Sequence, residues 1–155
     1  MRRSEREIRD PQDICSIIDR CKVFRVAMID GNKPYIVPLN FAYTYSDDVF
    51  TFYFHCAREG KKIDLIKANP HICFEMDGKH ELAEASTACN HSYLYQSIIG
   101  TGIAEFIEND FTKSAILEML MYQQTGTHWP ISPQQAAAVC ICQITVSEIS
   151  AKQHR

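Results

Sequence analysis

Strict alternation of apolar residues in short runs is the feature that most restricts the fold of this chain. In the run 49–56, VFTFYFHC, the rings of Phe50, Phe52 and Phe54 recur at every second position. The run 35–43, YIVPLNFAY, alternates in the same way. Successive side chains of a strand point to opposite faces, so both runs predict strands with one face on a hydrophobic core. A chain with several such runs folds as a β protein.

The remaining segments complete a mainly β plan with helices at the connections. Residues 10–21 predict a helix capped by Asp10, residues 60–68 a short helix, and the segment from Asp110 to Gly126 a longer one. The polar stretch 77–97 is expected to be irregular. Further strands are expected at 22–29, 71–76, 97–107 and 138–150, which makes six in all. Six strands joined mostly by hairpins predict a small antiparallel barrel with peripheral helices.

Composition bounds the class of protein. A chain of 155 residues fits one domain, 1–155, and its net charge of −3 argues against binding nucleic acid or acidic membranes through bulk charge. No apolar run is long enough to cross a bilayer, so a cytoplasmic protein is expected. The seven cysteines include no CxxC pair and their number is odd, which indicates reduced thiols and no structural metal site.

The junction HCAREGKK, residues 55–62, has the composition of a phosphate-binding turn. A helix that begins after Gly60 presents free backbone N–H groups, and Arg58, Lys61 and Lys62 can add cationic side chains. An exposed basic turn with no ligand is the equal alternative, because charge runs are usually solvated.

Two polar residues lie on the strand faces opposite the aromatic core. His55 could be a hydrogen-bonded structural residue or a proton donor, and it shares this orientation with Asn40. A ligand whose phosphate is held at the junction would extend along this face, where Pro38 at a bulge or sheet edge could leave backbone groups free. Trp129, in the loop THWPISP, could pack locally or form a lid over a neighbouring subunit's ligand.

Four motifs together resemble one protein group. MRRSEREI, PYIVPLNFAY, FYFHCAREGKKIDLIKANPHICFE and YQSIIGTGIAEFI are similar to the Nim proteins, the nitroimidazole-resistance group of the pyridoxamine 5′-phosphate oxidase-like, FMN-binding split-barrel superfamily. The resemblance spans Met1 to about Lys152, and VPLNF combined with FHCAREGKK is its most specific part. It implies a six-stranded antiparallel split β-barrel that forms a homodimer, with FMN at the subunit interface. The implied activity is the FMN-dependent reduction of a small electrophilic or nitroaromatic substrate.

The resemblance also implies roles for individual residues. His55 matches the histidine discussed as an active-site residue of Nim proteins, and it would be the catalytic group. The implied cofactor-binding residues are Val37, Pro38, Leu39, Asn40 and Phe41 along the flavin ring, His55, Cys56 and Ala57 beside the ribityl chain and phosphate, Lys61 and Lys62 on the phosphate, and Ser97 and Trp129, which could reach across from the partner subunit.

One departure from the group and one alternative function remain. Many relatives have an arginine where this chain has Gln96, which leaves substrate choice open, and the tail VSEISAKQHR is a poor match to a true pyridoxamine 5′-phosphate oxidase. The alternative is a flavin- or haem-binding module without turnover of its own. Its candidate iron ligands would be His71, His80, His91 and His128.

Overall fold

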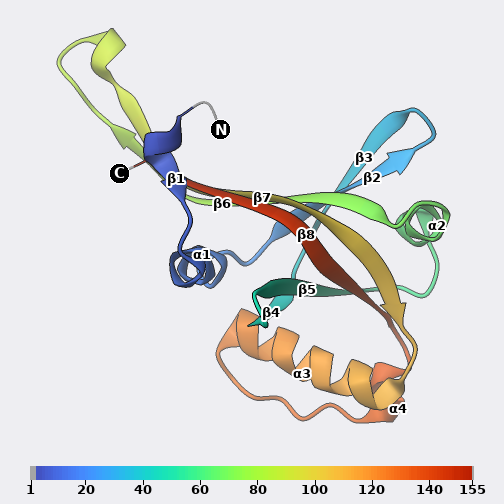
Figure 1. The fold of residues 1–155 in the computed structure, drawn as a ribbon. Coiled ribbons are helices and arrows are strands. Elements are labelled where there is room, and N and C mark those ends of the chain that lie inside the picture. Colours follow the sequence, from blue (N-terminus) through green and yellow to red (C-terminus); the bar gives the residue numbers. More distant parts are fainter. Residues whose placement is uncertain (1–2, 155) are drawn as a thin grey trace.

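A computed structural model describes residues 3–154 as one strongly curved antiparallel sheet with helices around it (Figure 1). Met1, Arg2 and Arg155 lie outside the described residues, and with them the first letters of the motif MRRSEREI and both ends of the expected 1–155 domain. The strand order is β3-β2-β6-β7-β8-β5-β4, with β1 paired to β8. The strands are β1 (Glu7–Ile8), β2 (Phe24–Asp30), β3 (Lys33–Leu39), β4 (Ala42–Ser46), β5 (Val49–Cys56), β6 (His71–Ala83), β7 (Ser92–Ile107) and β8 (Cys140–His154).

The sheet has eight strands, two more than the six expected. One is the short β1, and the other arises because the run 35–43 is two strands, β3 and β4, which lie at opposite ends of the strand order. Only Asn40 and Phe41 connect them, so the two sheet edges approach each other here without pairing. The barrel is therefore split, and the mainly β class is confirmed. The alternation of core-facing and outward-facing residues continues in phase from β3 into β4. Periodicity alone therefore could not reveal that the chain leaves one strand and begins another at Asn40 and Phe41.

The stretch 77–97 is not irregular, contrary to expectation. β6 and β7 continue through it as a hairpin that projects from the body of the molecule, drawn yellow-green at the upper left of Figure 1. The register shifts between Gly78 and Glu81, which marks a bulge in β6. Most side chains near the tip are exposed on both faces, so the segment lacks the apolar alternation by which strands are recognised.

The helices begin where local capping chemistry places them. α1 (Pro11–Ile18) is capped by Asp10, whose carboxylate accepts from the Gln12 N–H at 2.8 Å, as expected. α3 (Asp110–Thr125) is capped by Asn109 and not by Asp110, because Asn109 is extended and its side chain accepts from the Thr112 N–H at 3.0 Å. The other helical segments are α2 (Lys61–Ala68), α4 (Pro133–Ala136) and two 3-10 turns, η1 (Ser4–Arg6) and η2 (Ala88–Asn90).

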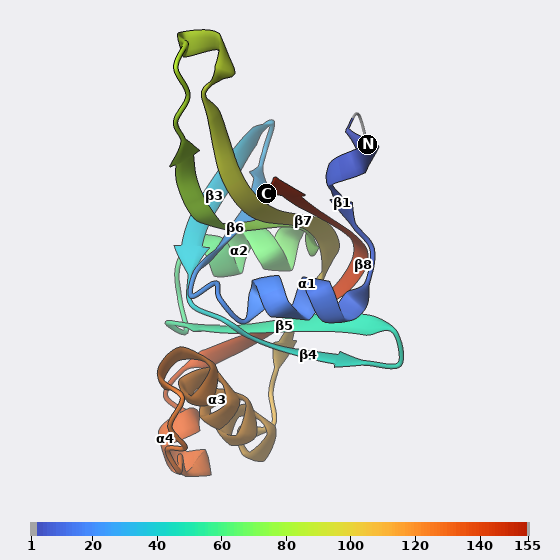
Figure 2. The ribbon, with the colours of Figure 1, turned by 90° about the vertical axis from the view of Figure 1, so that its left-hand side faces the viewer.

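The helices lie around the barrel and help to close it. In Figures 1 and 2, α1 and α2 lie between the β6–β8 part of the sheet and the β4–β5 part, and α3 and α4 lie beyond β4 and β5. Ile14, Ile17 and Ile18 of α1 and Ile63 and Ile66 of α2 are buried in the common core. Within residues 3–154, no helix combines the length and the apolar character that a membrane span requires.

Phenylalanine rings form the centre of the core. Phe24 lies 5.0 Å from Phe41 and 6.0 Å from Phe52 between ring centroids, and Phe52 lies 4.9 Å from Phe74. These rings come from β2, β5, β6 and the β3–β4 link, so one aromatic cluster joins both sides of the split. Burying each ring contributes about 2 to 3 kcal/mol to folding.

Candidate functional site

The basic junction between β5 and α2 has the backbone of an anion site. Gly60 is the N-cap of α2 with φ 137° and ψ 164°, and no side chain caps the helix. The Ile63 N–H donates to the Gly60 carbonyl at 2.9 Å, so the N–H groups of Lys61 and Lys62 are the first-turn donors left for an anion, and the helix dipole favours negative charge there. A hollow of about 610 Å³, lined by Ala57, Arg58, Glu59 and Ala138, opens beside the junction. The start of α2 after Gly60 is as the sequence predicts, whereas phosphate binding at this turn stays a prediction.

The two lysines of the junction point to different neighbours. Lys61 places its Nζ 2.6 Å from Asp30 Oδ2 and 4.7 Å from the centroid of the Tyr35 ring, so it contacts the β2–β3 hairpin. The hydrogen bond to Asp30 raises the pKa of Lys61. Lys62 lies on the other side, near Cys56: burial raises the pKa of that thiol, and the Lys62 charge partly offsets the rise. The turn thus has a cation near the end of β5 and another near β3.

β3 follows the sheet edge beside this junction. Val37 and Leu39 are half-buried on the core side, whereas Pro38 and Asn40 are exposed. β3 ends the strand order, and Pro38 pairs in register with Arg25 without a bulge, so the expectation of an edge strand is confirmed. One side of the β3 backbone therefore has no strand partner within residues 3–154.

The end of the β3 segment is held by amide contacts. Asn40 Nδ2 donates to the Lys22 carbonyl at 2.9 Å and to Gln124 Oε1 at 3.3 Å, and Gln124 Nε2 donates to the Phe41 carbonyl at 3.0 Å. The Phe41 side chain is fully buried in the aromatic cluster. Phe41 would therefore contribute to a ligand site only through its backbone. Sequence reasoning missed Gln124, because no local pattern marks this half-buried residue of the last turn of α3 as a contact of the link between β3 and β4.

His55 lies on the outer side of β5, exposed, as expected from its parity. In β5 it pairs with Ile141 of β8, and β4 pairs with β5 beginning at Ala42 opposite Tyr53. If this register is extended by two residues, Asn40 falls opposite His55. The fold therefore brings the two polar residues of the sequence prediction to one end of the β4–β5 pair, next to the basic junction.

An apolar hollow on the outer face of the sheet was not predicted. Its volume is about 760 Å³, and aliphatic or small side chains from β2, β3, β6 and β7 form most of its lining, among them Ala27, Ile29, Pro34, Cys73 and Ile103. Around and within it, Ile29 is 51%, Ile36 59% and Ile99 51% exposed. In the sequence, this apolar surface is indicated by isoleucines at strand positions whose side chains point away from the core.

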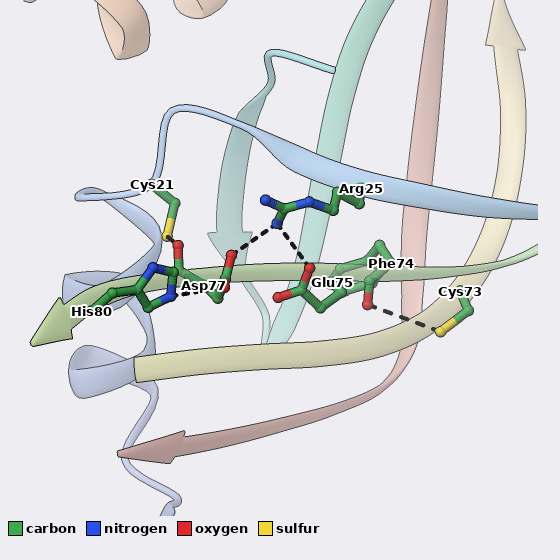
Figure 3. Close-up of polar contacts among 7 residues, drawn as sticks. All are labelled: Cys21, Arg25, Cys73, Phe74, Glu75, Asp77 and His80. Carbon is green, nitrogen blue, oxygen red and sulfur yellow. Dashed lines mark hydrogen bonds and ion pairs between the residues drawn. The ribbon is translucent and has the colours of Figure 1, made fainter. Parts of the chain in front are cut away.

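A charged cluster lies on the outer face of β2 and β6 (Figure 3). Arg25 Nη1 contacts Glu75 Oε2 at 3.0 Å and Asp77 Oδ1 at 2.8 Å, and His80 Nε2 contacts the other Asp77 oxygen at 2.8 Å. Ser97, predicted to contact the cofactor, pairs in register with Asp77 and so lies beside this cluster. Ser97 belongs to a different part of the sheet from the basic junction.

Trp129 and the candidate iron ligands are dispersed. Trp129 is 53% exposed in the α3–α4 loop, beyond β4 and β5, where the neighbouring His128 stacks on Tyr122 with ring centroids 4.4 Å apart. His71, His80 and His91 lie at the start of β6, at its bulge and near the hairpin tip. Within residues 3–154, no three or more His, Cys, Asp or Glu side chains are grouped to hold a metal ion.

Comparison with known proteins places this geometry in a family. The profile of the pyridoxamine 5′-phosphate oxidase family matches residues 10–153. A solved structure of a candidate 5-nitroimidazole antibiotic resistance protein from Bacteroides thetaiotaomicron shares 30% identity with this chain, with a TM-score of 0.81 over 95% of this chain and 86% of that protein. Comparison with curated proteins gives no significant match.

Two more distant structures share the fold. The flavocytochrome Anf3 from Azotobacter vinelandii has a TM-score of 0.81 at 18% identity, over 100% of this chain and 72% of that one. A protein from Mycobacterium smegmatis described as binding FAD and haem has a TM-score of 0.80 at 15% identity, over 97% of this chain and 74% of that one. At such identities the likeness establishes the fold and no more.

Proposed function

This chain belongs to the pyridoxamine 5′-phosphate oxidase family and groups with its Nim-type members, and from that membership we propose that it is an FMN-dependent oxidoreductase. Its substrate would be a small electrophilic or nitroaromatic molecule. The observation that carries the proposal is the uncapped, glycine-started α2 with its basic side chains, next to an exposed histidine and the free edge of β3.

The residues of the β5–α2 junction fit a flavin phosphate. The first-turn N–H groups after Gly60 supply donors, and Lys62 supplies a positive charge from the β5 side. Lys61 is engaged with Asp30 at 2.6 Å, so it would bind the phosphate only by sharing or leaving that carboxylate. Lys62 is therefore the stronger of the two predicted phosphate ligands.

The remaining residues fit the ring and the substrate. The free edge of β3 around Pro38 offers backbone groups to a flat heterocycle, although Pro38 itself has no N–H, and the exposed Pro38 ring offers an apolar surface. Bound FMN would supply the reducing equivalents. His55 lies where it can hold a substrate by a hydrogen bond and deliver a proton to it, since its ring is exposed beside the junction.

We assign the subunit interface of a homodimer to the outer face of the sheet. The apolar hollow of about 760 Å³ and the exposed Ile29, Ile36 and Ile99 supply apolar surface that a second copy could bury. Pro38 lies at the border of this face, so a partner seated there would contact a flavin ring at the β3 edge. Small molecules often bind at such subunit boundaries.

A flavin- or haem-binding module without turnover is the second candidate. Two proteins of the same fold are a flavocytochrome and a protein described as binding FAD and haem. The four histidines that could ligate iron are not grouped within residues 3–154, which favours flavin alone. His71 and His80 lie at the start and at the bulge of β6, His91 lies near the hairpin tip, and His128 follows α3.

Cofactor content is the decisive experiment. The absorbance spectrum of the freshly purified protein, and of what heat releases from it, identifies FMN, FAD or haem. Lys62→Ala should lose most of the flavin. Lys67→Ala is the matched control, because Lys67 is exposed in the last turn of α2 and away from its N-terminus.

Each outcome has a clear meaning. Released FMN, with flavin lost in Lys62→Ala only, supports the proposed site. A haem band would replace the proposal with the second candidate. A colourless protein that also fails to take up added FMN would rule out the flavin function.

A further inference from the structure

A polar cavity lies beneath the β6–β7 hairpin, on the opposite side of the sheet from Ser97. The Gln96 side chain points to the same side of β7 as that of the core residue Ile98, whereas Ser97 faces outward. The cavity has a volume of about 410 Å³ and lies between α1, its following turn and the strands β6, β7 and β8. We infer that it binds a small organic carboxylate. Its polar lining comprises Asp13, Ser16, Arg20, Lys79, Gln96 and Gln153.

A buried glutamine forms the floor of the cavity. Gln96 is 5% exposed, and its Oε1 accepts from Arg20 Nη1 at 3.1 Å. This contact fixes the orientation of the amide, and the Gln96 Nε2 has no acceptor among the described residues. No buried side-chain nitrogen or oxygen of the described residues lacks a hydrogen-bond partner, so this Nε2 is open to the cavity, where water or a ligand can accept from it. The same contact holds the Arg20 guanidinium, which keeps further N–H donors for a ligand.

The bulge in β6 brings a second cation to this cavity. The register shift between Gly78 and Glu81 includes Lys79, which has φ 54°. The bulge is held against the end of α1, because Cys21 Sγ contacts the Asp77 carbonyl at 3.7 Å (Figure 3). In the described part of the chain, neither Lys79 nor Arg20 forms an ion pair with a carboxylate.

Charge and size indicate the ligand class. Arg20 and Lys79 outweigh the single carboxylate of Asp13, so the cavity has a net positive charge in a protein whose net charge is −3. A guanidinium held in place matches a carboxylate by paired hydrogen bonds. The volume of about 410 Å³ exceeds that of a bare ion, and Leu94 adds an apolar wall, so the ligand has an organic body. Asp13 disfavours ligands of high negative charge.

Benzoate and its neutral analogue benzamide test the inference. We expect benzoate to bind saturably to the FMN-loaded protein in a calorimetric titration at low salt, and benzamide not to bind. Arg20→Gln should weaken benzoate binding about tenfold or more, since it removes a charged hydrogen-bond donor. Lys67→Gln removes the same charge from an exposed position in α2 and should leave the affinity unchanged.

A second variant and a second ligand complete the test. Lys79→Asn keeps a residue that tolerates positive φ and should weaken benzoate binding without unfolding the bulge. Three outcomes would each overturn the assignment. The first is an equal loss of benzoate affinity in Arg20→Gln and Lys67→Gln. The others are binding of benzamide, and binding of inorganic phosphate in place of benzoate. The flavin content of Arg20→Gln should equal that of the wild-type protein, which separates this inference from the proposed function.

Discussion

At the scale of single residues, close packing in β7 depends on two glycines. A Cβ at Gly100 would lie 2.4 Å from the Phe74 ring and 2.7 Å from the Glu148 carbonyl oxygen, and one at Gly102 would lie 2.5 Å from the Thr145 carbonyl oxygen. The register between β7 and β8 also shifts between Thr101 and Gly102. β7 therefore has a bulge at these glycines, and the flat ring of Phe74 occupies the space that a side chain at Gly100 would need.

Gly100→Ala should therefore destabilise the protein. The added methyl group meets an aromatic ring and a backbone oxygen, so we expect a loss of about 3 kcal/mol in the free energy of unfolding. Urea denaturation measures it. Gly78→Ala is the control, because a Cβ there meets only Cys21 Sγ at 4.0 Å, and it should change stability by less than about 1 kcal/mol. Equal losses in both variants would contradict the packing explanation.

A buried thiol makes stability sensitive to high pH. Burial raises the pKa of Cys142 from its ordinary value of 9.0 to about 12. The folded state therefore keeps a proton that the unfolded chain releases, and the contribution to stability is complete below about pH 9 and falls as the pH rises towards 12. The slope from this group is at most about 1.4 kcal/mol per pH unit.

Cys142→Ala tests this dependence. The variant should be less stable at neutral pH because it leaves a cavity, but its stability should fall less steeply above pH 9 than that of the wild-type protein. Chemical denaturation at several pH values gives both curves. Parallel curves would show that other groups, such as the phenol of Tyr43, whose pKa is also raised by burial, cause the whole alkaline loss.

His55 has a role that can be separated from flavin binding. It is exposed and lies in no core contact, so His55→Gln should fold and retain FMN. Loss of its proton should lower turnover of a nitroaromatic substrate by about 10²-fold or more. Anaerobic assays with a chemical reductant measure the rate, and the flavin spectrum measures occupancy. Unchanged turnover would remove His55 from the mechanism.

At the scale of elements, the start of α2 connects backbone conformation to cofactor binding. Gly60 has φ 137°, where other residues are strained, although a Cβ there meets nothing within 4 Å. Gly60→Ala should therefore cost about 1 to 3 kcal/mol through backbone strain alone, and it should weaken FMN binding because the first-turn N–H groups shift.

The matched variant is Gly31→Ala, which also replaces a positive-φ glycine in open space, but in the β2–β3 turn. Fluorescence titration of the stripped proteins with FMN, together with urea denaturation, separates the two effects. If Gly31→Ala weakens FMN binding as much as Gly60→Ala does, the turn has no specific part in holding the phosphate.

At the scale of the whole molecule, the exposed apolar face predicts the oligomeric state. Ile29→Lys places a charge in the hollow of the outer face and should convert a dimer into monomers that also lose flavin. Sedimentation velocity and the flavin spectrum check both. Val49→Lys is the control, since Val49 is 40% exposed in the β4–β5 hairpin, away from this face, and should remain dimeric. A dimeric, flavin-loaded Ile29→Lys would disprove this interface.

Local chemistry in the sequence determined most of the fold. Parity placed Phe50, Phe52 and Phe54 in the core and His55 outside it, and Asp10, Pro11 and Gly126 mark helix ends that the structure confirms. The family resemblance, now supported by the family profile and by a relative at 30% identity, identified the split barrel. These features depend on residues that are neighbours in the sequence or on motifs, so they can be predicted from the sequence alone.

The tertiary structure alone decided which residues distant in the sequence contact each other. Strand pairing over long sequence separations separated β3 from β4, extended β6 and β7 into a polar hairpin, and placed Arg20 against Gln96, 76 residues away. It also directed Lys61 to Asp30 rather than to open solvent. Such contacts follow from register and from the curvature of the sheet, which depend on the whole chain and have no local signal in the sequence.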